Sequence, residues 1–151
     1  MGSPVITLLT DFGLEDEYAG VMKGVILGIN PSVRIVDISH QVPPGDVRRA
    51  GWLLRWAWVY FPKGTIHVAV VDPGVGSRRK ILCLSHQGHL FLAPDNGVLS
   101  FVLSGIRNPK IFEVSNRRYA LKRVSCTFHG RDIFSPAAGH QTDEPGGDFP
   151  R

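Results

Sequence analysis

Two segments of the sequence combine residue types that can accept a proton, donate hydrogen bonds and stabilise negative charge. In VAVVDPGVGSRR, residues 68–79, an apolar run ends at Asp72, a Pro-Gly-Val-Gly turn follows, and Arg79 closes the segment. In TFHGRDIF, residues 127–134, His129 stands close to Arg131 and Asp132. A carboxylate, a guanidinium and an imidazole are groups that general acid–base catalysis uses. These segments are therefore the first candidates for a catalytic site.

Aspartate ends four apolar runs: LLTD at Asp11, RIVD at Asp37, AVVD at Asp72 and LAPD at Asp95. In an open parallel sheet, ligands bind in the crevice outside the carboxyl ends of the strands. Asp11, Asp37 and Asp72 each follow a strand that should run in the same direction. We therefore expect these three carboxylates to gather along one edge of the sheet. The alternative is structural, because aspartate is also a common turn and helix-cap residue.

Other site chemistries have weaker support. DPGVGSRR lacks the GxxxxGK[ST] spacing of a phosphate loop and precedes a strand rather than a helix. Asp37 and His40 could bind a metal ion, but the sequence offers no evident third ligand. Cys83 and Cys126 are far apart and outside any CxxC pattern, which indicates reduced thiols rather than a zinc site. We therefore expect no metal site.

The order of predicted elements indicates the fold class. Strand and helix patterns alternate through the first half of the chain, with strands at 5–10, 33–38 and 65–71 and helices at 15–29 and 46–62. This alternation is typical of a parallel sheet covered by helices. Beyond Asp72, weaker patterns predict strands at 81–85, 90–93, 110–114 and 119–121 and helices at 97–103 and from 133. We predict an α/β fold with a Rossmann-like, mostly parallel open sheet.

Composition limits the classes of partner. Hydrophobic residues make up 43% of the chain and charged residues 20%, as in an ordinary soluble domain. The net charge is +4, but the basic residues are scattered, whereas nucleic-acid binding needs a concentrated patch. The N-terminus has no signal-peptide pattern and no apolar run is long enough to span a membrane. We therefore expect a cytoplasmic protein with neither a nucleic-acid nor a membrane partner.

Five longer motifs occur in order along the chain: LLTDFG…DEYAGVMKG, IVDISHQVPPGDV, FPKGTIHVAVVDPGVGSRR, APDNGVL and TFHGRDIFSPAA. Together they resemble the S-adenosylmethionine hydroxide adenosyltransferase family, also called S-adenosylmethionine hydrolases. The fluorinating and chlorinating enzymes that use the same substrate are relatives of that family. The resemblance covers residues 5–139 and implies an N-terminal α/β domain at 1–139. We expect the polar segment 140–151 to be a disordered tail.

The resemblance implies hydrolysis of S-adenosylmethionine to adenosine and methionine, with no cofactor. It assigns water activation to Asp72, Arg79 and His129, and the residues leave open whether Asp72 or His129 is the base. In the halogenating relatives a tyrosine replaces Asp72 and a serine stands at the position of Gly130. Asp72 and Gly130 therefore favour hydroxide over halide as the nucleophile.

The resemblance also implies the substrate contacts and the assembly. Asp11 matches the carboxylate that holds the ribose hydroxyls, Asp16 and Tyr18 match positions near the methionine end, and Phe128 would lie against the substrate. Members of the family are longer and form trimers in which a C-terminal β-barrel domain completes the neighbour's site. We expect that domain to be absent here. A non-catalytic remnant that binds S-adenosylmethionine or adenosine is therefore the alternative, with a metal-dependent hydrolase and a halogenase less favoured.

Overall fold

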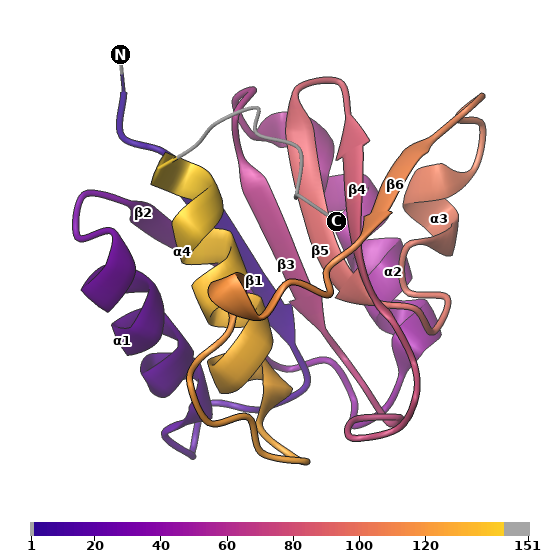
Figure 1. Cartoon of the computed structure of the whole chain (residues 1–151). Helices are drawn as coiled ribbons and strands as arrows, with labels where there is room; N and C mark the ends of the chain where they lie inside the picture. Colours follow the sequence, from indigo (N-terminus) through magenta and orange to yellow (C-terminus); the bar gives the residue numbers. More distant parts are fainter. Residues whose placement is uncertain (1, 144–151) are drawn as a thin grey trace.

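The computed structural model describes residues 2–143, and a six-stranded sheet forms its centre (Figure 1). The strand order is β2-β1-β3-β5-β4-β6. The first four strands in this order are parallel to one another, whereas β4 is antiparallel to both β5 and β6. The predicted α/β fold with a mostly parallel sheet is therefore confirmed. The strands are β1 (Val5–Thr10), β2 (Arg34–Ser39), β3 (Ile66–Val70), β4 (Ile81–His86), β5 (His89–Pro94) and β6 (Lys110–Glu113).

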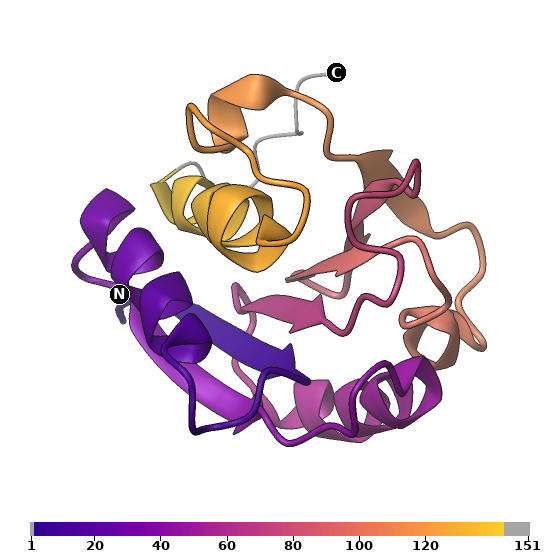
Figure 2. The ribbon, with the colours of Figure 1, turned by 90° about the horizontal axis from the view of Figure 1, so that it is seen from below.

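Helices cover both faces of the sheet (Figure 2). On one face lie α1 (Tyr18–Ile29) and α4 (Ser135–Asp143), and on the other lie α2 (Val47–Ala57) and α3 (Ser100–Leu103). Alternate residues of a strand point to opposite faces, so β1 supplies Leu8 to the first core and Leu9 to the second. Both leucines are fully buried. The sheet is thus held from both sides, which fixes the carboxyl ends of its parallel strands.

Two local predictions need correction. Residues 119–121 do not form a strand, because Arg117–Tyr119 is a 3₁₀ turn in which the Asn116 side chain accepts a hydrogen bond from the Arg118 amide. The last helix begins as a π-helical turn, Gly130–Phe134, before α4. The Ser135 hydroxyl stabilises this wider turn by donating to the Gly130 carbonyl at 2.6 Å.

Only the first residues of the predicted tail belong to the part of the chain that the structure describes. α4 continues to Asp143 and therefore includes the first residues of segment 140–151, whereas 144–151 lie outside the described residues. The domain boundary at 139 stays a prediction.

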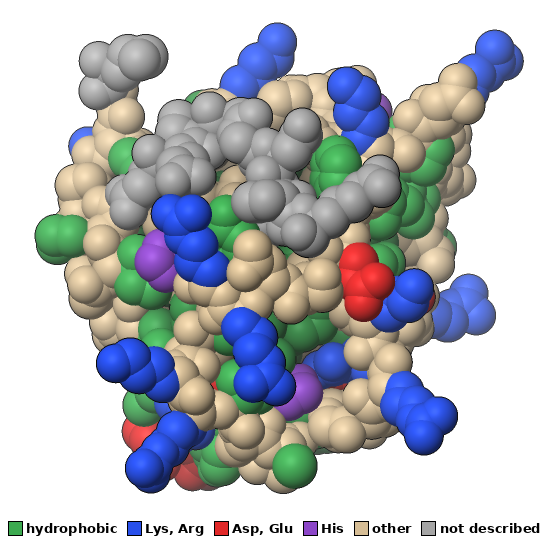
Figure 3. Space-filling view, viewed as in Figure 1, with side chains coloured by type: hydrophobic (Ala, Val, Ile, Leu, Met, Phe, Trp, Pro, Cys, Tyr) green, Lys and Arg blue, Asp and Glu red, His purple; other side chains and the backbone are tan. Residues whose placement is uncertain are grey.

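Within residues 2–143, no helix has the length and apolar character that a membrane span requires. Lys and Arg side chains stand apart over the face shown in Figure 3.

Candidate functional site

Just beyond the carboxyl end of β3, Arg79 contacts both Asp72 and His129. The Arg79 Nε atom is 2.7 Å from Asp72 Oδ2, and Arg79 Nη2 donates to the same oxygen. That Nη2 atom is also 2.8 Å from His129 Nδ1. Because a guanidinium only donates hydrogen bonds, the Nδ1 atom is the acceptor, and the proton of a neutral His129 ring resides on Nε2.

Two turns return Arg79 to Asp72. The Val75 amide donates to the Asp72 carbonyl at 3.1 Å, and the Ser77 amide donates to the Gly74 carbonyl at 3.0 Å. The chain therefore reverses within the Pro-Gly-Val-Gly segment, as the sequence predicts.

Gly76 brings the distant His129 segment against this loop. Its φ is +78°, and a Cβ atom placed on it would lie 2.4 Å from the Cys126 carbonyl oxygen. A side chain at position 76 would force the two segments apart. Glycine at this position therefore allows residues 72–79 and 126–129 to pack closely enough for Arg79 to reach His129.

The cluster is shielded from solvent. The Asp72 side chain is 4% exposed and the Arg79 side chain is 10% exposed. Asp72 Oδ1 is buried and has no hydrogen-bond partner among residues 2–143. Buried polar atoms in proteins are nearly always paired, so an unpaired carboxylate oxygen indicates a place for a ligand or a water molecule.

Burial and the adjacent charge of Arg79 lower the pKa of His129 below its usual 6.5. The Ser125 backbone and the carboxylates of Asp72 and Asp132 act in the opposite direction and do not outweigh these effects. His129 is therefore neutral at pH 7, consistent with its acceptance of a hydrogen bond from Arg79.

The residues Arg131 and Asp132 shape the loop that carries His129 and do not join the cluster. Asp132 is fully buried and accepts hydrogen bonds from the Ser125 amide at 2.8 Å and from Arg131 Nε at 2.6 Å. Burial acts to raise the pKa of Asp132, but the hydrogen bonds from Arg131 and Ser125 lower it overall. A charged Asp132 thus holds the turn that leads into Phe128 and His129.

A cavity of about 320 Å³ opens beside His129, whose chain neighbours Phe128 and Gly130 both line it. Tyr18 and Phe128 stack in its wall with ring centroids 5.2 Å apart. The Arg131 guanidinium lies 5.0 Å from the centre of the Phe128 ring. Aromatic walls with charged groups at the margin suit a ligand that has flat or apolar parts and a charge. The lining residues are Phe12, Glu17, Tyr18, Val21, Met22, Thr127, Phe128, Gly130 and Arg131.

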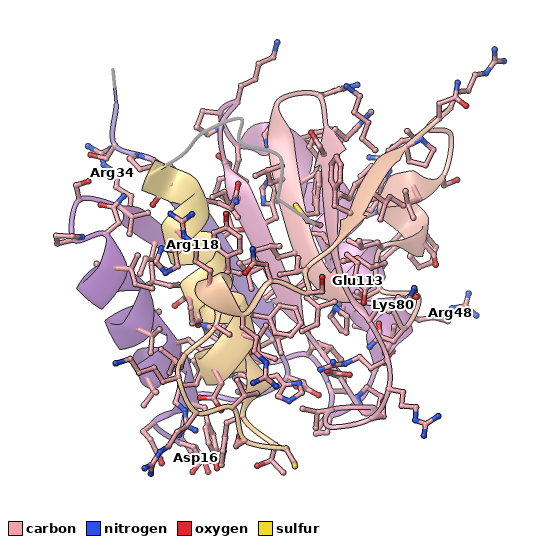
Figure 4. All side chains as sticks on the ribbon, in the orientation of Figure 1. Asp16, Arg34, Arg48, Lys80, Glu113 and Arg118 are labelled. Carbon is pink, nitrogen blue, oxygen red and sulfur yellow. The ribbon has the colours of Figure 1, made fainter. Side chains whose placement is uncertain are left out.

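The other predicted carboxylates have separate environments. Asp11 follows β1, and its Oδ2 accepts a hydrogen bond from the Gly45 amide at 2.8 Å. Asp16 is exposed at the lower end of the molecule in Figure 4 and does not line the cavity, whereas its neighbour Glu17 does. The sequence alone could not separate Asp16 from Glu17, since both precede α1 in an acidic run.

Contrary to prediction, Asp37 does not lie at the edge of the sheet where the carboxyl ends of the parallel strands meet. It lies within β2 opposite Leu8, whereas Asp11 and Asp72 follow the ends of their strands. Its carboxylate pairs with Lys23 Nζ at 2.6 Å and with His40 Nε2 at 2.9 Å. The structure brings together no group of three metal-ligating side chains within residues 2–143.

Comparison with known proteins decides the family. Residues 6–146 match the family profile described as the SAM hydroxide adenosyltransferase N-terminal domain. The chain belongs to the SAM hydroxide adenosyltransferase family. The resemblance inferred from the sequence motifs is thereby confirmed.

Known proteins resemble the chain in sequence, and a solved structure resembles it in fold. It is 43% identical over 139 residues to a protein of Salinispora tropica named (R)-S-adenosyl-L-methionine hydrolase, covering 90% of this chain and 52% of the relative. A Thermotoga maritima crystal structure of an uncharacterised protein superposes with a TM-score of 0.89 at 44% identity, covering 95% of this chain and 55% of that one. A fluorinase of an Actinoplanes species is more distant, at 26% identity over 92% of this chain and 54% of the fluorinase. The chain thus spans about half the length of these relatives.

Proposed function

We propose that the chain hydrolyses S-adenosyl-L-methionine to adenosine and L-methionine. The observation that carries the proposal is the contact of Arg79 with both Asp72 and His129, with one buried Asp72 oxygen left unpaired by the described residues. The names of its hydrolase relatives supply the substrate. No cofactor is required, because the sulfonium of this substrate is itself a good leaving group.

In the proposed reaction a water molecule attacks the ribose C5′ in line with the bond to sulfur. The new bond joins the water oxygen to C5′, and the C5′–S electron pair leaves with the thioether of methionine. The water proton passes to Asp72 Oδ1, the carboxylate oxygen that accepts no hydrogen bond from the part of the chain that the structure describes. Arg79 holds Oδ2 and stabilises the negative charge that develops at the oxygen of the water.

His129 has a different part in this scheme. Its Nδ1 already accepts a hydrogen bond from Arg79, so Nε2 of the neutral ring can donate a hydrogen bond. This arrangement favours Asp72 as the base and His129 as the group that orients the water. Asp72 and Gly130 are both present here, which continues to favour water over halide as the nucleophile.

The substrate contacts are proposed from the same geometry. Asp11 would bind the ribose hydroxyls with the carboxylate oxygen that does not accept from Gly45. The stacked Tyr18 and Phe128 rings would form the wall of the cavity against the substrate. Asp16 would reach the ammonium group of the methionine end only from outside the cavity, whereas Glu17 lies in its wall.

The length of the chain bears on activity. Because the chain spans about half of its relatives, a non-catalytic form that binds S-adenosylmethionine or adenosine remains the second candidate. The homo-trimer implied by the family resemblance also stays a prediction.

The decisive experiment is incubation of the purified chain with S-adenosylmethionine in water enriched in ¹⁸O. Attack at C5′ puts the label on the 5′ oxygen of adenosine, which mass spectrometry detects. Asp72→Asn is the test variant, because it keeps the size of the side chain and loses the carboxylate base. We expect labelled adenosine from the wild type and none above background from D72N. Absence of adenosine together with binding of the substrate by calorimetry would favour the second candidate, and loss of activity on chelation would favour a metal-dependent hydrolase.

A further inference from the structure

Two adjacent residues at the end of β5 hold both ends of the loop that carries Asp72 and Arg79. The Asn96 Nδ2 atom donates to the carbonyl of Val71, the residue before Asp72, at 2.8 Å. The Asp95 amide donates to the carbonyl of Lys80, the residue after Arg79, at 2.8 Å. Segment 95–96 therefore holds the backbone directly next to Asp72 and directly next to Arg79.

The parallel sheet explains why this segment reaches the loop. β3 and β5 are parallel neighbours, with Val68 opposite Leu92, so both strands end at the same edge. The regular ladder does not extend to Val71, which is fully buried. The Asn96 side chain supplies the hydrogen bond that the Val71 carbonyl needs at this position, because a buried carbonyl without one is costly.

The Asn96 side chain is itself fixed in place. Its Oδ1 atom accepts a hydrogen bond from the Val98 amide at 3.2 Å, an arrangement in which an asparagine side chain closes a turn. The amide group thus uses its oxygen to hold its own turn and its nitrogen to hold the neighbouring strand. Aspartate, which is of the same size, keeps the first contact but at neutral pH cannot make the second.

We propose that Asn96 is a positioning residue of this site: by holding the Val71 carbonyl it fixes Asp72 against Arg79, and it sets the rate of the chemical step without touching substrate. The proposal rests on the proposed function for its effect on turnover. It also makes a claim about the geometry of the cluster that can be measured without turnover.

The test variant is Asn96→Asp, and the matched control is Asn116→Asp. Asn116 makes the same kind of turn, since its Oδ1 accepts from the Arg118 amide at 3.0 Å, but it lies in the 3₁₀ segment away from the site. For N96D we expect kcat to fall roughly 10- to 100-fold with KM changed less than about twofold, because sub-ångström displacement of a catalytic group has effects of this size. N116D should match the wild type in both.

A second readout is the titration of the His129 ring, followed by NMR and assigned by loss of its signal in His129→Asn. The Asp72 carboxylate raises the pKa of His129 and Arg79 lowers it. Displacement of Asp72 should therefore lower the midpoint of this titration in Asn96→Ala, which removes the donor without adding a charge, with no change in Asn116→Ala. If N96D does not fold by circular dichroism, the values of kcat and KM are compared between Asn96→Ala and Asn116→Ala instead.

Three outcomes are distinguishable. A selective loss of kcat together with a lowered His129 midpoint supports the proposal. Equal behaviour of the Asn96 and Asn116 variants in both measurements overturns it. If the wild type has no turnover, the proposed function fails and the titration alone decides whether Asn96 positions Asp72.

Discussion

Replacement of Gly76 by alanine tests whether the close approach of two loops assembles the site. The φ of Gly76 is +78°, where an L-residue costs about 1–2 kcal/mol relative to glycine. In addition, the new Cβ atom would lie 2.4 Å from the Cys126 carbonyl oxygen, so the loops must separate by about 0.6 Å to bring this contact to 3.0 Å. Overpacking of this kind costs roughly 1–3 kcal/mol more.

Gly105→Ala is the matched control for the backbone contribution. The φ of Gly105 is +84°, and a Cβ atom there would meet no heavy atom within 4 Å. G105A should therefore lose only the conformational part of the free energy of unfolding. The difference between the two variants measures the contact between residue 76 and Cys126.

The assay is urea unfolding of both variants and the wild type, followed by the formation of adenosine. We expect G76A to be less stable than G105A by about 1–3 kcal/mol. Its turnover should fall on the order of tenfold or more, because the separated loops carry Arg79 and His129. Equal stability of G76A and G105A, with turnover of G76A unchanged, would show that this contact does not hold the site together.

Three further predictions concern a buried histidine, thiol reactivity and the hydrogen bonds of Arg79. Burial, aided by the charge of neighbouring His89, lowers the pKa of His67 to about 3, so the unfolded chain binds one more proton between pH 3 and 6.5. The free energy of unfolding should therefore fall by up to ~1.4 kcal/mol per pH unit below 6.5, with a smaller pH slope in His67→Gln, and parallel urea curves would contradict this. Cys83 is buried and burial raises its pKa to about 12, whereas Cys126 is exposed. Ellman's reagent should therefore label only Cys126 rapidly in the native protein, and rapid labelling that persists in Cys126→Ser would contradict this. Arg79→Lys should reduce adenosine formation at least tenfold with little change in melting temperature, because one ammonium group cannot reproduce the planar guanidinium that bonds Asp72 and His129 together. Wild-type turnover in this variant would show that this pair of contacts is not needed for the reaction.

Much of the fold follows from local sequence patterns. The apolar run of β1 and the helical spacing of α1 are set by neighbouring residues, so the predicted ranges agree with the structure to within a few residues. The 119–121 segment was less predictable, since an asparagine side chain and a buried tyrosine override its strand-like composition. Asp37 shows the same limit, because its partner Lys23 comes from α1, another element.

For this protein the sequence by itself determined the family and the residue types of the candidate site, because the motifs that carry Asp72, Arg79 and His129 are long and ordered. Only the tertiary structure decided which atoms meet. The contact of Arg79 with His129 depends on the approach of Gly76 to a segment about fifty residues away. The Asp72 oxygen that has no partner within residues 2–143 and the contact of Asn96 with the Val71 carbonyl likewise arise where parallel strands end together, a consequence of strand order that no local pattern contains.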